Sequence, residues 1–191
     1  MFLVVVVLAG ALAVPLLGGR LSALADVEVR LGWVLFAALA LQAASLYLPG
    51  LPRGARAALM VASYPVAGVF VAANRRLPGV PLAALGAALN FLAIVANGGI
   101  MPASPSALAT AGLPQGVPGY RSSTAVADPR LWFLGDVFAI PASWPFSNVF
   151  SVGDVLLALG AVWGLHRVCG SRLASPLRAR RPRPPSAPDG T

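Results

Sequence analysis

The stretch Leu131–Gly160, LWFLGDVFAIPASWPFSNVFSVGDVLLALG, places two carboxylates in the most aromatic part of the chain. Asp136 and Asp154 are two of only six acidic residues among 191. The aromatic residues around them are Trp132, Phe133, Phe138, Trp144, Phe146 and Phe150. Carboxylates in such apolar surroundings either cap helices and form turns or belong to a functional site. Both the fold and the function therefore depend on how this stretch is interpreted.

The composition predicts an integral membrane protein. Apolar residues make up 58% of the chain and charged residues 10%, and the mean hydropathy is +0.79. Soluble domains have about 45–50% apolar and about 25% charged residues, so these few charges could not cover a soluble surface. The single Cys169 excludes an internal disulfide and a thiolate metal cluster. We expect no metal and no cofactor.

Five apolar stretches predict an all-α integral membrane bundle of about five transmembrane helices. At 1.5 Å per residue, such stretches approach the roughly 30 Å thickness of a bilayer core. The predicted spans are about 1–19, 31–49, 57–74, 80–97 and 151–168. Ala11-Leu12-Ala13 in the first span also fits a signal peptide, but no basic residue precedes the run, which favours a retained helix.

The transmembrane domain covers residues 1–169, and residues 170–191 form an Arg/Pro-rich tail that we expect to be disordered. A long loop, 98–150, joins the fourth and fifth spans. Within it, Ser104-Pro105 followed by Gly112 predicts a short helix. The apolar segment Leu131–Ile140 is too short to span and is predicted to lie at the membrane interface or to dip into the bundle.

The distribution of arginine orients the predicted bundle. All fourteen basic residues are arginine, and they gather at the ends of the spans and in the tail. The net charge of +8 therefore indicates topology control and membrane lipids as partners, with no nucleic acid. With a cytoplasmic tail, ten arginines lie inside and four outside. We expect a multi-pass cell-membrane protein with a cytoplasmic C-terminus and an extracytoplasmic loop 98–150.

Polar and small residues within the spans indicate how the helices pack. Asn90 and Asn97 are seven residues apart and lie on nearly the same helix face. They either bond to neighbouring helices or line a cavity, and interhelical bonding is the favoured interpretation. Gly160 and Gly164 form a pair of small residues that lets another helix approach closely.

A structural interpretation accounts for both aspartates. Ser151-Val152-Gly153-Asp154 fits a capping box, in which the serine caps the helix and the acid bonds back to it. The negative charge also suits the first turn of a helix. Asp136 follows Gly135 and can form a turn.

The functional alternative makes Asp136 and Asp154 a catalytic pair. A carboxylate at bilayer depth costs about 2.5–3.5 kcal/mol and tends to mark a functional site. Two carboxylates brought close in an apolar pocket share a proton, so that one acts as acid and the other as base. This is the chemistry of an aspartic peptidase, and it requires the two segments to converge. The candidate supporting residues are Asn90, Asn97, Asn148 and Ser151.

The chain resembles an uncharacterised family of bacterial multi-pass membrane proteins, a domain of unknown function. The resemblance rests on LNFLAIVANGGIMPASPSALATAG (Leu89–Gly112), LWFLGDVFAI and SNVFSVGDVLLALG. It covers nearly everything before the tail and implies no activity.

A second, local resemblance involves the lipoprotein signal peptidases. Phe150-Ser151-Val152-Gly153-Asp154 is similar to their FNxAD motif, and Gly135-Asp136-Val137-Phe138 is similar to their VVDF motif. This implies Asp136 and Asp154 as catalytic residues and a lipidated or membrane peptide as substrate. Ser151 stands where the family has Asn, Gly153 replaces Ala, and the family's upstream Gly-Asn and Asp-Arg motif is absent.

Three functions are consistent with the sequence. The first is a membrane protein of unknown function whose aspartate motif is structural or binds a partner or lipid. The second is a membrane-embedded aspartic peptidase. The third, a small transporter, is less favoured because the spans lack charged residues and repeated halves.

Overall fold

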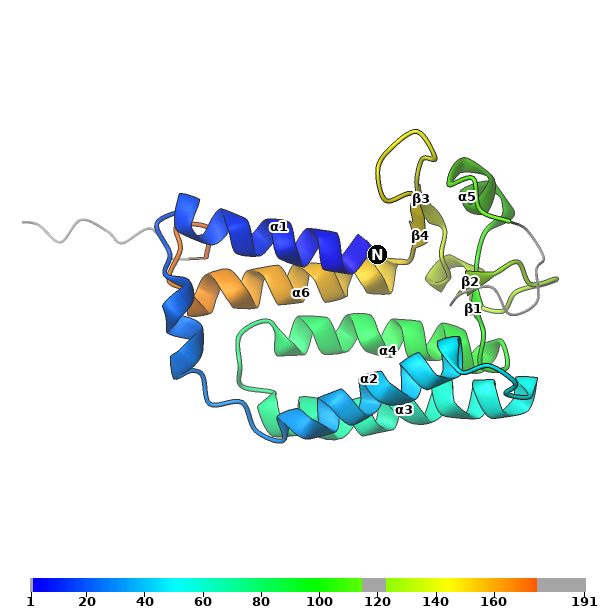
Figure 1. The fold of residues 1–191 in the computed structure, drawn as a ribbon, viewed down its shortest axis with the longest axis horizontal. Helices are drawn as coiled ribbons and strands as arrows, with labels where there is room; N and C mark the ends of the chain where they lie inside the picture. Colours follow the sequence, from blue (N-terminus) through cyan, green and yellow to red (C-terminus); the bar gives the residue numbers. More distant parts are fainter. Residues whose placement is uncertain (1, 115–122, 175–191) are drawn as a thin grey trace, which may run out of the picture.

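The computed structural model describes residues 2–114 and 123–174, which are built mainly from long helices (Figure 1). The long helices are α1 (Phe2–Leu16), α2 (Gly32–Tyr47), α3 (Arg53–Asn74), α4 (Val80–Ala96) and α6 (Val152–Val168). Each of the five apolar stretches identified in the sequence forms one of them. The predicted tail lies almost entirely outside the described residues, as does the part of the loop over 115–122.

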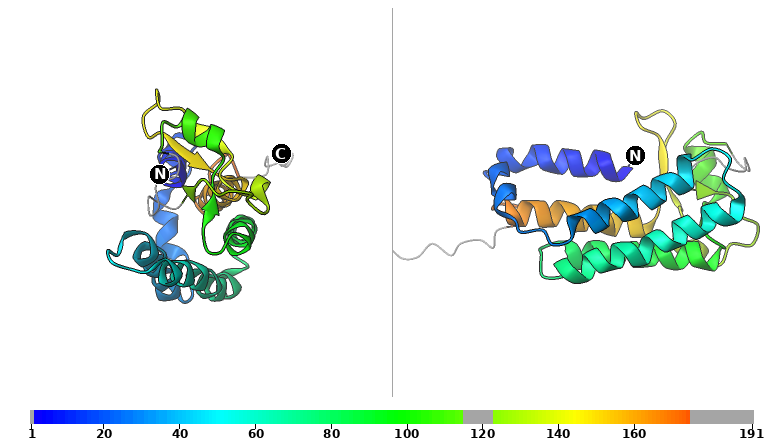
Figure 2. Two further views of the ribbon diagram at one scale, coloured as in Figure 1. Left: turned by 90° about the vertical axis from the view of Figure 1, so that its right-hand side faces the viewer. Right: turned by 60° about the horizontal axis from the view of Figure 1, so that its bottom comes forward.

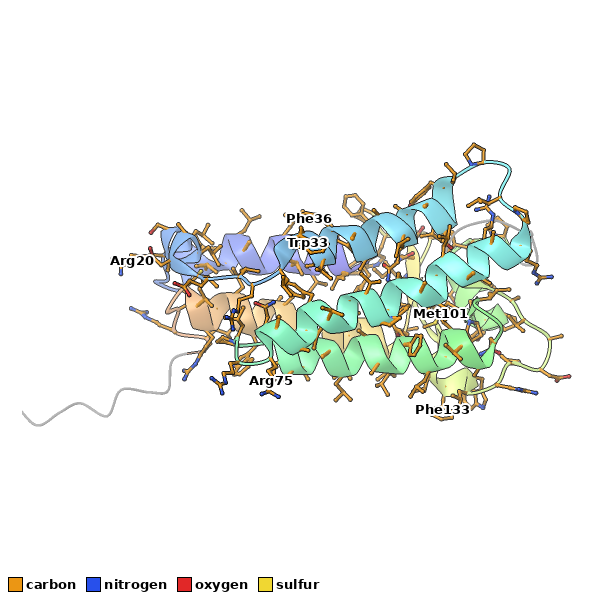
Figure 3. The ribbon with its side chains drawn as sticks, turned by 90° about the horizontal axis from the view of Figure 1, so that it is seen from below. Arg20, Trp33, Phe36, Arg75, Met101 and Phe133 are labelled. Atoms are coloured by element: carbon orange, nitrogen blue, oxygen red, sulfur yellow. The ribbon has the colours of Figure 1, made fainter. Side chains whose placement is uncertain are left out.

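The long helices run up and down, so their ends meet at two poles of the molecule. In Figures 1 and 2, α1 lies beside α6, and α2 and α3 lie on the side of α4 away from α1. A short 3-10 helix, η1 (Leu21–Asp26), joins α1 to α2. One pole, which we call the arginine-rich end, carries Arg20 and Arg75, and the opposite pole carries Met101 and Phe133 (Figure 3).

Helix α3 begins earlier than the sequence predicted, at Arg53 instead of Ala57. Pro52, with a φ of −59°, precedes the first turn, where the missing N–H of proline has no helical partner to lose. The Arg56 side chain then folds back onto α2. Its Nη1 donates to the carbonyl oxygen of Ser45 at 2.7 Å and its Nη2 to that of Leu48 at 2.8 Å. These bonds satisfy carbonyls that the end of α2 leaves open.

The segment between α4 and α6 folds into a small unit at the pole opposite the arginine-rich end, and we call residues 101–114 and 123–150 the cap. Its elements are β1 (Met101–Pro102), α5 (Pro105–Thr110), β2 (Ser123–Thr124), η2 (Trp132–Leu134), β3 (Phe138–Ile140) and β4 (Asn148–Phe150). The predicted short helix is confirmed as α5. The strands were not predicted: β1 pairs parallel with β2, and β3 pairs antiparallel with β4.

The cap has its own small apolar core. The buried members of this core are Ala103, Ala107, Leu108, Ala111 and Val149. They come from α5, β4 and the residue after β1, so burial joins parts of the cap that are far apart in sequence. The segment predicted to lie at the interface, Leu131–Ile140, contributes η2 and β3 to this unit.

The backbones of α6 and of the start and middle of α4 approach closely at several glycines. A Cβ atom added at Gly160 would lie 2.8 Å from the carbonyl oxygen of Gly79, and one at Gly164 would collide with the carbonyl oxygen of Pro78. Gly86 lies against Gly153 in the same way. The predicted role of Gly160 and Gly164 in close helix approach is therefore confirmed.

Among the described helices, α3 alone is both long and apolar enough to cross a membrane, judged by length and composition. Helices α1, α2 and α4 are apolar but have only 15 to 17 residues. The described residues thus form a mostly helical protein in which one helix has the length and composition of a membrane span.

Candidate functional site: a polar cluster between helices α4 and α6

The capping box predicted for the start of α6 is present. The Oγ of Ser151 accepts a hydrogen bond from the backbone N–H of Asp154 at 2.9 Å. In return, the Asp154 carboxylate accepts one from the backbone N–H of Ser151 at 3.1 Å, through Oδ2. These two bonds satisfy donors that a helix N-terminus otherwise leaves open.

Asn90, on α4, completes the cluster from the neighbouring helix. Its Nδ2 donates to Oδ1 of Asp154 at 2.8 Å, and its Oδ1 accepts from the Ser151 hydroxyl at 2.7 Å. Ser151 is fully buried and Asn90 is 7% exposed. The favoured interpretation of Asn90, bonding between helices, is confirmed. We call Asn90, Ser151 and Asp154 the polar cluster.

The polar cluster requires glycine at position 153, because a larger residue would displace Asn90. A Cβ atom there would collide with Oδ1 of Asn90 and would lie 2.6 Å from the carbonyl oxygen of Gly86. Gly153 stands where the signal-peptidase motif has alanine, so the departure has a local steric reason. In this chain the space of that methyl group is taken by the Asn90 amide.

Asp136 is held separately, in the cap. Its backbone N–H donates to the carbonyl oxygen of Pro102 at 2.8 Å, and its carbonyl oxygen accepts from the N–H of Ser104 at 3.0 Å. These bonds extend the edge of β1, and the side chain is 3% exposed. Asp136 is therefore an ordered, buried residue of the cap and more than a simple turn former.

Tyr64, on α3, is half-buried between helices. Its ring also contacts the ring of Phe91 on α4, with centroids 5.1 Å apart. The signal for Tyr64 in the sequence is weak: one tyrosine next to Pro65 in an apolar stretch.

Two of the supporting residues lie outside the cluster. Asn97 binds the backbone of Arg130: its Oδ1 accepts from the N–H at 3.0 Å, and its Nδ2 donates to the carbonyl oxygen at 2.8 Å. Asn97 therefore fixes the cap to the end of α4. Asn148 is half-buried at the start of β4, opposite Ile140. Within the described ranges, no three His, Cys, Asp or Glu side chains come together as a group that could hold a metal ion.

The chain belongs to the family of unknown function DUF5317, which matches residues 26–165. The matched region includes both aspartates and all residues of the polar cluster. The resemblance to a family without assigned activity is therefore confirmed. Neither a curated protein nor a solved structure matches the chain.

Proposed function

We propose that this chain is a multi-pass membrane protein that holds a folded cap at the outer membrane surface and acts there by binding a lipid or a protein partner. The observation that carries this proposal is the apolar outer face of the helices. Leu16 is 84% exposed, Tyr47 77% and Phe36 73%. Large apolar side chains exposed along the helices in such numbers belong against lipid or a partner.

The helix lengths are compatible with this location. Helices of 15 to 17 residues extend about 23–26 Å, a few Å less than a bilayer core of about 30 Å. A short hydrophobic stretch is accommodated by local thinning of the bilayer at a fraction of a kcal/mol per Å. Aromatic side chains prefer the interface. Those exposed on the cap are Trp132, Phe133, Phe138, Trp144 and Phe146.

The orientation follows from the arginines and can be tested directly. The proposal places the arginine-rich end in the cytoplasm and the cap outside. Reporter fusions after Gly116 and at the C-terminus should then give opposite signals, one for the outside and one for the cytoplasm. The same signal from both sites would overturn the five-span arrangement.

The polar cluster serves in this proposal as a structural lock between α4 and α6. Both carboxylate oxygens of Asp154 are engaged, one by Asn90 and one by Ser151. Asp154→Asn can keep only one of these bonds with its single amide oxygen. We expect it to lower the free energy of unfolding by about 1–3 kcal/mol, because the bonds lost involve a charged acceptor.

The measurement is the unfolding of purified protein in detergent. Asp128→Asn is the matched control, because it removes the same charge from an exposed position in the cap. It should change the free energy of unfolding by less than about 0.5 kcal/mol. Equal effects of the two variants would contradict the lock.

The aspartic peptidase is the second candidate, and the observation that favours it is the burial of Asp136, which is 3% exposed in the aromatic part of the chain. In this proposal one carboxylate activates water and the other supplies a proton. Asp136→Asn and Asp154→Asn should each abolish cleavage of a lipid-anchored or membrane peptide in proteoliposomes. Cleavage that persists in either variant, or is absent from the unmodified protein, would exclude it.

A further inference from the structure

A cavity of about 390 Å³ opens at the arginine-rich end, where α3 ends beside the segment leading into α2. Its volume lies within the range of about 300–1,000 Å³ that is typical of small-molecule sites. The residues that line it, which we call the arginine pocket, are Glu28, Arg30, Ala72, Ala73, Asn74, Arg75, Arg76 and Leu77.

The two walls of this pocket are fixed to each other by Asn74, whose side chain is 3% exposed. Its Nδ2 donates to the carbonyl oxygen of Arg30 at 2.7 Å, and its Oδ1 accepts from the backbone N–H of Arg30 at 2.9 Å. Arg30 is 44 residues earlier in the chain than Asn74. The backbone of Arg30 is therefore held beside the end of α3, and three arginines line one cavity.

The charge of the pocket suits a phosphate group. Three arginines and one glutamate line it, which leaves an excess of positive charge. The planar guanidinium group forms paired hydrogen bonds that match the oxygens of a phosphate. Arg75 and Arg76 would also balance the dipole at the end of α3. That role does not require Arg30 from another segment to be fixed beside them.

We infer that the arginine pocket binds the phosphate group of an anionic lipid headgroup. Basic pockets between helices on the cytoplasmic side of a membrane recognise such headgroups. Figure 3 shows Arg75 at the same end of the bundle as Arg20, away from the cap. The lipid as the source of the phosphate depends on the membrane location proposed above, and free phosphate would offer the same chemistry.

The test is a binding titration of the full chain, purified in a non-ionic detergent, with three probes. Short-chain phosphatidylglycerol supplies the anionic headgroup, short-chain phosphatidylcholine supplies a zwitterionic one, and inorganic phosphate supplies the anion alone. We expect phosphatidylglycerol to bind at least tenfold more tightly than phosphatidylcholine. Inorganic phosphate that binds as tightly as phosphatidylglycerol would assign the pocket to a free anion and overturn the lipid source.

Charge variants at opposite ends of α3 distinguish binding in the arginine pocket from binding to arginine elsewhere on the surface. The double variant Arg75→Gln, Arg76→Gln should weaken phosphatidylglycerol binding about 20- to 30-fold, at about fivefold per arginine. Arg53→Gln is the matched control, because Arg53 is an exposed arginine at the first position of the same helix. It should change binding by less than about twofold, since it is far beyond the range of screened electrostatics.

Glu28→Gln gives an effect of opposite sign. It removes the negative charge from the pocket and should tighten phosphatidylglycerol binding about two- to threefold. A gain of affinity cannot come from a loss of folding. Equal binding of the two lipids, an equal loss in Arg53→Gln, or no gain in Glu28→Gln would overturn the inference. Extraction of membranes with alkaline carbonate tests the membrane location separately, so its failure is distinguishable from failure of the pocket.

Discussion

Asn74 and Asn97 make the same kind of clamp at opposite ends of the bundle. Each ends a helix, and each side chain binds both backbone groups of a distant arginine, Arg30 in one case and Arg130 in the other. In both places the residue that follows the arginine is a leucine with positive φ, 53° at Leu31 and 51° at Leu131. A new helix begins directly after each leucine.

The two clamps differ in their access to solvent and in what they join. Asn74 is buried and joins α3 to the segment that starts α2, within the bundle. Asn97 is half-buried and joins the end of α4 to the cap. Where water can replace a lost partner, a hydrogen bond contributes less to stability. The same pair of hydrogen bonds should therefore contribute more to stability at Asn74 than at Asn97.

Of the substitutions that test this difference, Asn74→Ala should lower the free energy of unfolding most. It leaves the N–H and carbonyl of Arg30 without their partner in a buried place. We expect the free energy of unfolding to fall by about 2–4 kcal/mol, measured by denaturant titration in detergent. Asn148→Ala is a control of the same chemistry at a half-buried position in the cap. It should cost less than about 1 kcal/mol.

Asn97→Ala should have a smaller and more local effect. We expect a loss of about 1–2 kcal/mol, because water can reach the freed groups of Arg130. Hydrogen exchange should speed up in η2 and the residues just before it, while α2 and α3 stay protected. A loss as large as that of Asn74→Ala would contradict the distinction between a buried and a half-buried clamp.

Leu31→Asn and Leu131→Asn should have the smallest effects. Left-handed backbone is unfavourable for leucine, and asparagine tolerates it. The relief of roughly 1 kcal/mol opposes the loss of apolar contact from a side chain that is already 42% or 38% exposed. Both variants should therefore stay within about 1 kcal/mol of the parent in the same titration. A larger loss at one site would show that its leucine packs against something essential.

Local patterns in the sequence predicted much of this structure. Apolar runs gave the long helices to within a few residues, and Ser104-Pro105 with Gly112 gave α5. Ser151 and Asp154 gave the capping box, because its bonds join residues only three apart. The sequence predicted that Asn90 would bond to a neighbouring helix. It did not predict that the partner would be Asp154 on α6.

The rest depended on contacts between distant segments. Both clamps join residues more than thirty positions apart, and no pattern near Asn74 points to Arg30. The same holds for the parallel pairing of β1 with β2. A two-residue strand has too little periodicity to be recognised. The contact of Tyr64 with Phe91 likewise follows from helix packing and not from the neighbours of Tyr64 in sequence.

The ring of Phe2 stacks on that of Phe150, with centroids 4.2 Å apart and planes 7° from parallel. Through this contact and its packing on α6, α1 is held in place by segments near the other end of the described chain. During synthesis α1 leaves the ribosome long before either partner exists. Its final docking therefore comes only after α2, α3 and α4 have been made and α6 has followed them. The docking of α1 onto α6 is thus a late step of assembly, whereas the α2–α3 pair can form early.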